Sequence, residues 1–208
     1  MEDVLELYHQ PYDPAHPVIC MDETNKQLVG ETRTPVPARP GQPRRINYEY
    51  ERRGTADVFL FTEPLGNWRC VDITETRTRI DWAHQIKNLV DVYYPEATKI
   101  RLVMDNLNTH SIGSLYEAFS PEDARRIAEK LEIHYTPKHG SWLNVAEIEL
   151  RVLTVQCLSR RIEDAATLRR EVTAWEKARN ESDAHVDWQF TSSDARIHLK
   201  QLYPRIEL

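Results

Sequence analysis

The chain has 208 residues, of which 40% are hydrophobic and 29% charged, and it contains five tryptophans and nine tyrosines. This composition excludes an intrinsically disordered chain, and the length predicts one folded domain over residues 1–208. The formal net charge of −6 gives no general attraction to nucleic acid, so a DNA-binding surface would need a local cluster of basic residues.

Three cysteines, Cys20, Cys70 and Cys157, show no CxxC spacing and cannot all pair within the chain. The sequence therefore predicts neither a disulfide framework nor a thiolate zinc site. The N-terminal residues are acidic where a signal peptide is basic, and no apolar run approaches the length of a membrane span. We expect a cytoplasmic protein that is neither exported nor embedded in a membrane.

The first part of the chain predicts a short helix, a strand and a loop. Residues 2–9 have helical spacing, and three prolines then break the backbone. The apolar run Pro17–Met21 predicts a short buried strand with Asp22 and Glu23 at its tip. Residues 33–47 hold four prolines among arginines, which predicts an extended, solvated loop.

The middle of the chain alternates between strands and helices. Residues 55–61 and 68–74 are rich in β-branched and aromatic side chains and predict an antiparallel hairpin. Residues 79–94 carry apolar side chains at helical spacing. The apolar run 100–104 predicts another short strand, and it leads directly into Asp105.

A helix with a proline in its first turn is expected to begin near Ser120, followed by a strand over 131–135. Three further helices are predicted over residues 142–158, 165–179 and 191–202. This order of elements predicts an α/β fold with a mixed five-stranded sheet flanked by helices, as in a ribonuclease H-like core.

Two of the predicted strands end in an aspartate, Asp22 and Asp105, and sites in sheets with parallel strands collect at such ends. Each aspartate taken alone also fits a plain role in a turn or helix cap. Cleavage of a phosphodiester bond is served by two divalent ions about 4 Å apart, and magnesium prefers carboxylate oxygens. The eight histidines are scattered, with no paired Cys/His spacing that would favour a softer metal.

Three segments resemble the catalytic blocks of the mariner superfamily of DDE transposases, and specifically its bacterial insertion-sequence branch. They are residues 20–23 (CMDE), 105–110 (DNLNTH) and 140–148 (GSWLNVAEI). The resemblance spans roughly residues 5–204 and implies that Asp22, Asp105 and Glu147 are the catalytic acids. It also implies that they hold Mg²⁺ or Mn²⁺, with two ions at the site.

Glu149 competes with Glu147 for the role of third acid, because it follows only two residues later. On a helix the two side chains point in different directions, so only one of them faces the site. Glu147 is preferred because it has the family's position after Leu143-Asn144.

The resemblance implies hydrolysis of phosphodiester bonds at transposon ends and joining of the freed 3′-hydroxyl to target DNA, with no covalent protein intermediate. Transposon and target DNA are the expected partners, and the family suggests a homodimer on DNA. Such transposases carry a helix-turn-helix domain before the catalytic domain, whereas about twenty residues precede Asp22 here. We therefore expect a catalytic domain that lacks its own helix-turn-helix domain, with a separately encoded helix-turn-helix protein as a candidate partner.

Several other residues have both a functional and a structural interpretation. Glu23 is a candidate supporting acid, but as the neighbour of Asp22 on an extended segment it is expected to point to the opposite side. Trp142 is expected to pack in the core in preference to stacking on a base. Four residues are expected to support the metal site or position DNA, with a structural role as the alternative: Asn106, His110, His139 and Asn144.

The arginine-rich stretch over residues 33–53 is the candidate DNA-contacting arm, with a solvated surface loop as the alternative. The arginines assigned to DNA are Arg39, Arg44, Arg45, Arg52 and Arg53. Arginines also occur at positions 160, 161, 169 and 170, where ion pairs along helices are an equal alternative.

Two other functions remain open from the sequence. One is another ribonuclease H-like nuclease, such as a resolvase or an RNA-strand hydrolase, which would use a similar group of carboxylates. The other is an inactive or domesticated protein that only binds DNA or a partner. Acids at all three motif positions favour an active enzyme.

Overall fold

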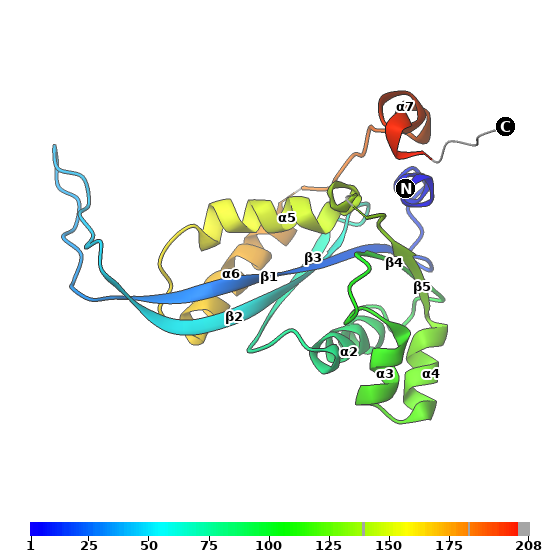
Figure 1. Ribbon diagram of the computed structural model, residues 1–208, viewed down its shortest axis with the longest axis horizontal. Coiled ribbons are helices and arrows are strands. Elements are labelled where there is room, and N and C mark those ends of the chain that lie inside the picture. The colour runs from blue at the N-terminus through cyan, green and yellow to red at the C-terminus, as the bar shows by residue number, and fades with distance from the viewer. Residues whose placement is uncertain (139, 183, 204–208) are drawn as a thin grey trace.

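The computed structural model of the chain describes residues 1–138, 140–182 and 184–203. Figure 1 shows a sheet with helices on both faces and a long arm that projects from one end. The strands are β1 (Val18–Glu31), β2 (Tyr50–Glu63), β3 (Trp68–Thr74), β4 (Ile100–Met104) and β5 (Leu131–Tyr135). The α-helices are α1 (Glu2–Tyr8), α2 (Arg79–Asn88), α3 (Ile112–Ala118), α4 (Pro121–Glu129), α5 (Val145–Leu153), α6 (Ala165–Glu181) and α7 (Ser192–His198).

The five strands lie in the order β3-β2-β1-β4-β5. Strand β2 pairs antiparallel with both β1 and β3, whereas β4 pairs parallel with both β1 and β5. The predicted mixed five-stranded sheet and its hairpin are therefore confirmed. The switch from antiparallel to parallel pairing occurs at β1, which is where both candidate aspartate strands meet.

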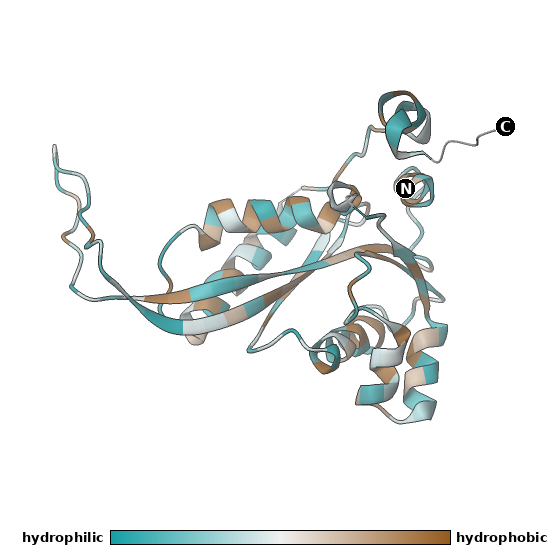
Figure 2. Cartoon of the chain, in the orientation of Figure 1, coloured by the Kyte–Doolittle hydropathy of each residue, from teal (hydrophilic) through white to brown (hydrophobic). Residues whose placement is uncertain are grey.

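Alternate residues of the central strands enter two separate hydrophobic cores, because successive side chains of a strand point to opposite faces. Cys20 and Val103 belong to the core beneath α5 and α6. Ile19, Met21 and Met104 belong to the core beneath α2, α3 and α4. Figure 2 shows hydrophobic residues along these strands and on the helices beside them.

Strand β1 is longer than predicted, and Asp22 is therefore not at its tip. The strand continues past Met21 to Glu31, because β2 supplies hydrogen-bonding partners along this polar stretch. Strand β2 likewise begins at Tyr50, so Arg52 and Arg53 lie in a strand and not in the expected loop. The parallel pairing of β1 with β4 does end near Asp22, because its last pair is Cys20 with Val103.

Residues 32–49 form the projecting arm between β1 and β2, and it is more ordered than the predicted loop. Two isolated antiparallel bridges join Val36 to Arg45 and Arg39 to Gln42. Gly41 lies in the turn between Arg39 and Gln42 and has a φ of 76°, a conformation that glycine adopts at low cost. The arm is thus a narrow hairpin with exposed side chains along its length.

The predicted helices differ in detail from those observed. The helix expected over 79–94 is α2 followed by a π-helical turn, Leu89–Tyr93. The helix expected over 142–158 starts only at Val145, after a 3₁₀ turn, and also ends in a π-helical turn. Helix α3 has no counterpart among the predicted elements, because it is short and has no side-chain cap. Among the described helices, none is both long and apolar enough to cross a membrane.

Candidate active site

The parallel pairing of β1 with β4 brings Asp22 and Asp105 to the same end of the β1–β4 pair. The last paired residues are Cys20 and Val103, so Asp22 and Asp105 each follow two residues after this pair, and the charge of Asp105 acts on Asp22. Cys20 and Val103 both face the core beneath α5. Because side chains alternate along a strand, Asp22 faces α5 as well.

Asn144 joins the start of α5 to β1 next to Asp22. Its buried side chain is the N-cap of α5, with Oδ1 accepting from the Ala146 amide at 3.2 Å. Its Nδ2 donates to the Met21 carbonyl at 2.9 Å. Glu147 lies in the first turn of α5. The Asn144 side chain therefore sets the position of this turn relative to Asp22 on β1. These contacts give Asn144 a structural role, which was the alternative to supporting the metal site or positioning DNA; the functional role stays a prediction.

Burial and neighbouring acids together raise the pKa of Asp22. Burial, above all, raises the pKa of Asp22 from its ordinary value of 3.8 to about 7. The Glu23 amide, which donates to Asp22 Oδ1 at 2.8 Å, opposes the rise, while the charges of Glu23, Asp105 and Glu147 add to it. At neutral pH, without a bound cation, the Asp22 carboxyl is therefore partly protonated.

The donor set fits a hard divalent cation, because the three acids offer only carboxylate oxygens. Within the described ranges, neither Asp22 nor Glu147 forms an ion pair with a basic side chain. The described side chains do not include a group of three or more His, Cys, Asp or Glu residues close enough to hold a metal ion.

We expect Asp22→Asn to stabilise the metal-free protein above pH 7. A carboxyl whose folded pKa is raised binds its proton more tightly in the native state than in the unfolded chain. Stability is then lost as the pH rises from about 4 to about 7. The variant has no such group, so its melting temperature in EDTA should exceed that of the wild type by an amount that grows over this range. An equal pH dependence of the two proteins would contradict the raised pKa.

His110 lies between two carboxylates on the other side of β1. Its Nδ1 is 2.6 Å from Asp105 Oδ1, and its Nε2 is 3.1 Å from Glu23 Oε2. Burial by itself lowers the pKa of His110, but the contacts with Asp105 and Glu23 outweigh it and raise the pKa to about 9. The ring also stacks on Trp82, with the ring centroids 6.0 Å apart. As predicted, Glu23 points away from the face that Asp22 occupies.

Glu149 lies on the opposite side of α5 from the site and is engaged in a buried ion-pair network. Its Oε1 is 3.3 Å from Arg69 Nη2 and 3.0 Å from Arg179 Nη2. The side chains of Glu149 and Arg69 are 1% and 0% exposed. Arg69 is further held by Asn67 and by the Ala184 carbonyl. The network ties α5 to β3 and α6 and leaves Glu149 no free oxygen for another role.

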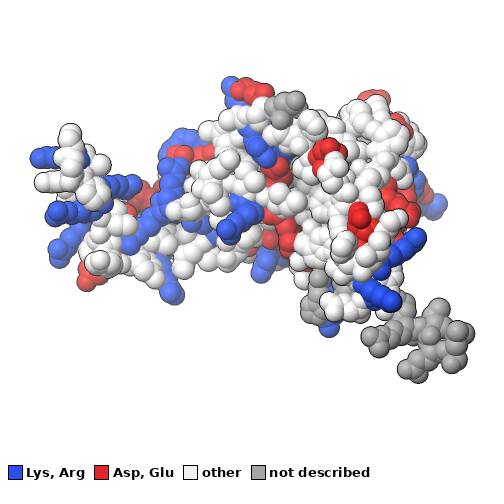
Figure 3. Space-filling model, turned by 90° about the horizontal axis from the view of Figure 1, so that it is seen from above, with Lys and Arg blue, Asp and Glu red and all other residues white. Residues whose placement is uncertain are grey.

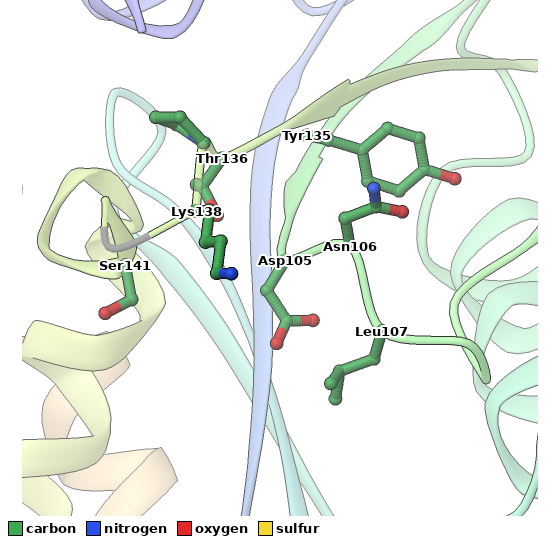
Figure 4. Close-up of a pocket in the computed structure, with 8 residues that line it drawn as sticks. Asp105, Asn106, Leu107, Tyr135, Thr136, Lys138 and Ser141 are labelled. Carbon is green, nitrogen blue, oxygen red and sulfur yellow. The ribbon is translucent and has the colours of Figure 1, made fainter. Parts of the chain in front are cut away.

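An open pocket of about 600 Å³ lies beside Asp105. Figure 4 shows the Asp105 carboxylate and the Lys138 ammonium pointing toward one another across this pocket. Asn106 lines the same pocket, and Tyr135 donates from its hydroxyl to the His110 carbonyl at 3.0 Å. Sequence patterns did not identify Lys138 and Tyr135 as site residues, although both lie in the segment just before the third block.

Two other predicted residues have different outcomes. Trp142 is not in the core: it is 38% exposed, and it stacks on Trp188 and meets Phe190 edge-on. Its apolar neighbours Leu143 and Val145 favour burial, but the 3₁₀ turn directs it outward. His139 lies outside the described residues.

Basic side chains gather on the arm and the adjoining surface, as Figure 3 shows. Of the five arginines assigned to DNA, and within the described part of the chain, only Arg53 forms ion pairs, at 3.1 Å to Glu51 and 3.2 Å to Glu163. Arg39, Arg44 and Arg45 are exposed on the arm. By contrast, Arg160 is paired with Glu171, one of the acids expected to pair with these arginines, whereas Arg161 is paired with Glu31 of β1, which was not among them.

The fold resembles several solved transposase structures. A Mos1 mariner paired-end complex with Mn matches with a TM-score of 0.58 and 17% identity, over 85% of this chain and 52% of that chain. A Mos1 paired-end complex with the left transposon end matches with a TM-score of 0.57 and 16% identity, over 85% and 53%. A Mos1 strand transfer complex matches with a TM-score of 0.58 and 14% identity, over 85% and 52%.

At these identities the likeness establishes the fold, which is the predicted ribonuclease H-like one. The chain spans about half the length of these solved structures. No curated protein matches the sequence. Residues 17–169 match the protein family described as DDE superfamily endonuclease. Because this match covers more than half of the chain, the protein belongs to the DDE superfamily of endonucleases.

Proposed function

We propose that this protein is the catalytic domain of a DNA transposase from the bacterial insertion-sequence branch of the mariner superfamily. In this proposal it cleaves phosphodiester bonds at transposon ends and joins the 3′-hydroxyl to target DNA. The observation that carries the proposal is the way Asn144 fastens the first turn of α5 to β1 at Met21, beside the end of the β1–β4 pairing. This contact supports a site made of Asp22, Asp105 and Glu147, which belong to three separate segments.

The three acids act as ligands in this mechanism and take up no proton themselves. Divalent cations, when bound, activate the attacking oxygen and stabilise the leaving oxygen. The protein's part is to present Asp22, Asp105 and Glu147 from rigid elements, so that little reorganisation is needed. Glu147 is favoured as the third acid because Glu149 is already held by Arg69 and Arg179.

The pocket beside Asp105 is a suitable place for the DNA backbone. Lys138 and Asn106 line it together with Ser141, which gives one cation and several hydrogen-bonding groups for phosphate oxygens. Lys138 is a compact point charge on the side of the pocket that faces Asp105, and it forms no ion pair among the described residues. We propose that it neutralises a phosphate next to the one that is cut.

The test of this function is the metal dependence of DNA nicking. We expect the purified chain to nick supercoiled plasmid in Mg²⁺ or Mn²⁺ and to lose this activity in excess EDTA. Activity that persists in EDTA, or a preference for the RNA strand of an RNA–DNA hybrid, would contradict the proposal and favour another nuclease.

The arm should contribute to DNA affinity by neutralising phosphates. Replacing Arg44 and Arg45 together with Gln should weaken binding to any duplex. It should also reduce the slope of log K against log salt by about 1 for each phosphate that an arginine no longer neutralises. The matched control replaces Arg125 and Arg126 of α4, which are paired with Glu129 of the same helix and with Asp91 of the π-helical turn after α2. Fluorescence anisotropy over a range of salt concentrations measures both; equal slopes for the two double variants would rule the arm out as a DNA-binding element.

A further inference from the structure

We propose that Glu23 is a positioning residue for Asp105 and acts through His110. The imidazole joins the two acids, with Nε2 3.1 Å from Glu23 Oε2 and Nδ1 2.6 Å from Asp105 Oδ1. The side chains of His110 and Glu23 are 1% and 3% exposed, so water does not compete for the contact between them. This inference rests on the proposed function, because it assumes that Asp105 is a metal ligand.

Adjacent acids of β1 then serve one site from opposite faces of the sheet. Asp22 faces α5 and contributes its own oxygens. Glu23 faces the core beneath α2, where the neighbouring strand residues are Met21 and Phe59. From the face beneath α2, Glu23 cannot reach a metal shared with Glu147 of α5. It can position the His110 ring, which in turn contacts Asp105.

Asp105 needs such support because it follows the end of β4 and has no strand partner of its own. The His110 ring is well placed to give it. Besides the two acids, the ring stacks on the fully buried Trp82, and the His110 amide donates to the Leu107 carbonyl at 3.0 Å. Tyr135 donates to the His110 carbonyl, so the ring and its backbone are both fixed. Ligand carboxylates are often oriented in this way by partners that touch no metal.

The test measures Mn²⁺ binding by calorimetry, without DNA, in the full chain and in Glu23→Gln, His110→Gln and the double variant. We expect each single variant to bind Mn²⁺ about 10–100-fold more weakly, which is the usual effect of removing such a partner. Because Glu23 acts through His110, the double variant should bind no more weakly than His110→Gln. Losses that multiply in the double variant would overturn the proposal, since Glu23 would then act independently of His110.

The matched control is Glu63→Gln, which alters another buried glutamate of the sheet, whose Oε2 accepts from Tyr94 at 3.1 Å. It should leave Mn²⁺ affinity unchanged. A loss of affinity equal to that of Glu23→Gln would show that any buried charge matters, and would overturn the proposal. Should Glu23→Gln fail to fold, Glu23→Asp takes its place, because it keeps the charge but is too short to reach the ring.

A second readout does not depend on metal at all. Amide hydrogen exchange at His110 and its neighbours should accelerate in metal-free Glu23→Gln and stay unchanged in Glu63→Gln, because only the first releases the ring. Unchanged exchange in both would overturn the positioning role. If instead the wild type binds no Mn²⁺ while exchange responds as expected, the metal-dependent function fails and the Glu23–His110–Asp105 linkage stands.

Discussion

Asp105→Asn is expected to lower the rate of plasmid nicking by more than about a hundred-fold without unfolding the protein. Loss of a residue that merely orients a metal ligand typically costs about 10–100-fold, and loss of a ligand should cost more. The side chain is 33% exposed and lines the open pocket, so the isosteric amide is easily accommodated. Nicking in Mn²⁺, with circular dichroism to verify the fold, measures the effect.

The control for this prediction is Asp123→Asn. Asp123 is an accessible carboxylate in the first turn of α4, with a side chain 55% exposed, and it takes no part in the site. It should nick at the wild-type rate. If Asp105→Asn nicks as fast as Asp123→Asn, Asp105 is not a catalytic ligand and the transposase assignment fails with it.

Glu149→Gln is expected to destabilise the protein by about 3–5 kcal/mol, the usual effect of removing one partner from a buried ion pair. Arg69 is fully buried and would be left with an uncompensated charge, and Arg179 would also be without its carboxylate partner. For a chain of this size the melting temperature should fall by on the order of 10 °C. Thermal denaturation followed by circular dichroism measures this directly.

Glu147→Gln should have the opposite effects, although it lies only two residues away. Glu147 has no basic partner among the described residues, so the free energy of unfolding should change by less than about 0.5 kcal/mol. Nicking should nevertheless be abolished, because a ligand is missing. A stable, inactive Glu149→Gln together with an active Glu147→Gln would reverse the assignment of the third acid.

The two predictions together separate stability from function along a single helix. One face of α5 is held by the buried ion pairs of Glu149 with Arg69 and Arg179. The other presents Glu147, which has no basic partner among the described residues. On that second face the pKa of Asp22 is raised, because burial and neighbouring acids disfavour its charged form. Sites that bind cations commonly keep such strain in the absence of the cation.

The sequence by itself determined the sheet and the candidate acids. Apolar runs before Asp22 and Asp105, together with the alternation of the hairpin strands, specified buried strands, because side-chain burial follows local periodicity. The three short segments also pointed to Asp22, Asp105 and Glu147 without any structure. Polar residues beyond Asp22 obscured the rest of β1, since a strand made of polar residues depends on the partner strand for its hydrogen bonds.

Only the tertiary structure decided what surrounds those acids. Asn144 reaches Met21, and Arg69 reaches Glu149, across 123 and 80 residues of sequence, so no local pattern could have paired them. The same holds for His110, which the sequence placed near Asp105 but not between Asp105 and Glu23. Buried polar groups must find partners wherever the fold brings them, and that long-range pairing assigned Glu149 to the scaffold and left Glu147 as the candidate third acid.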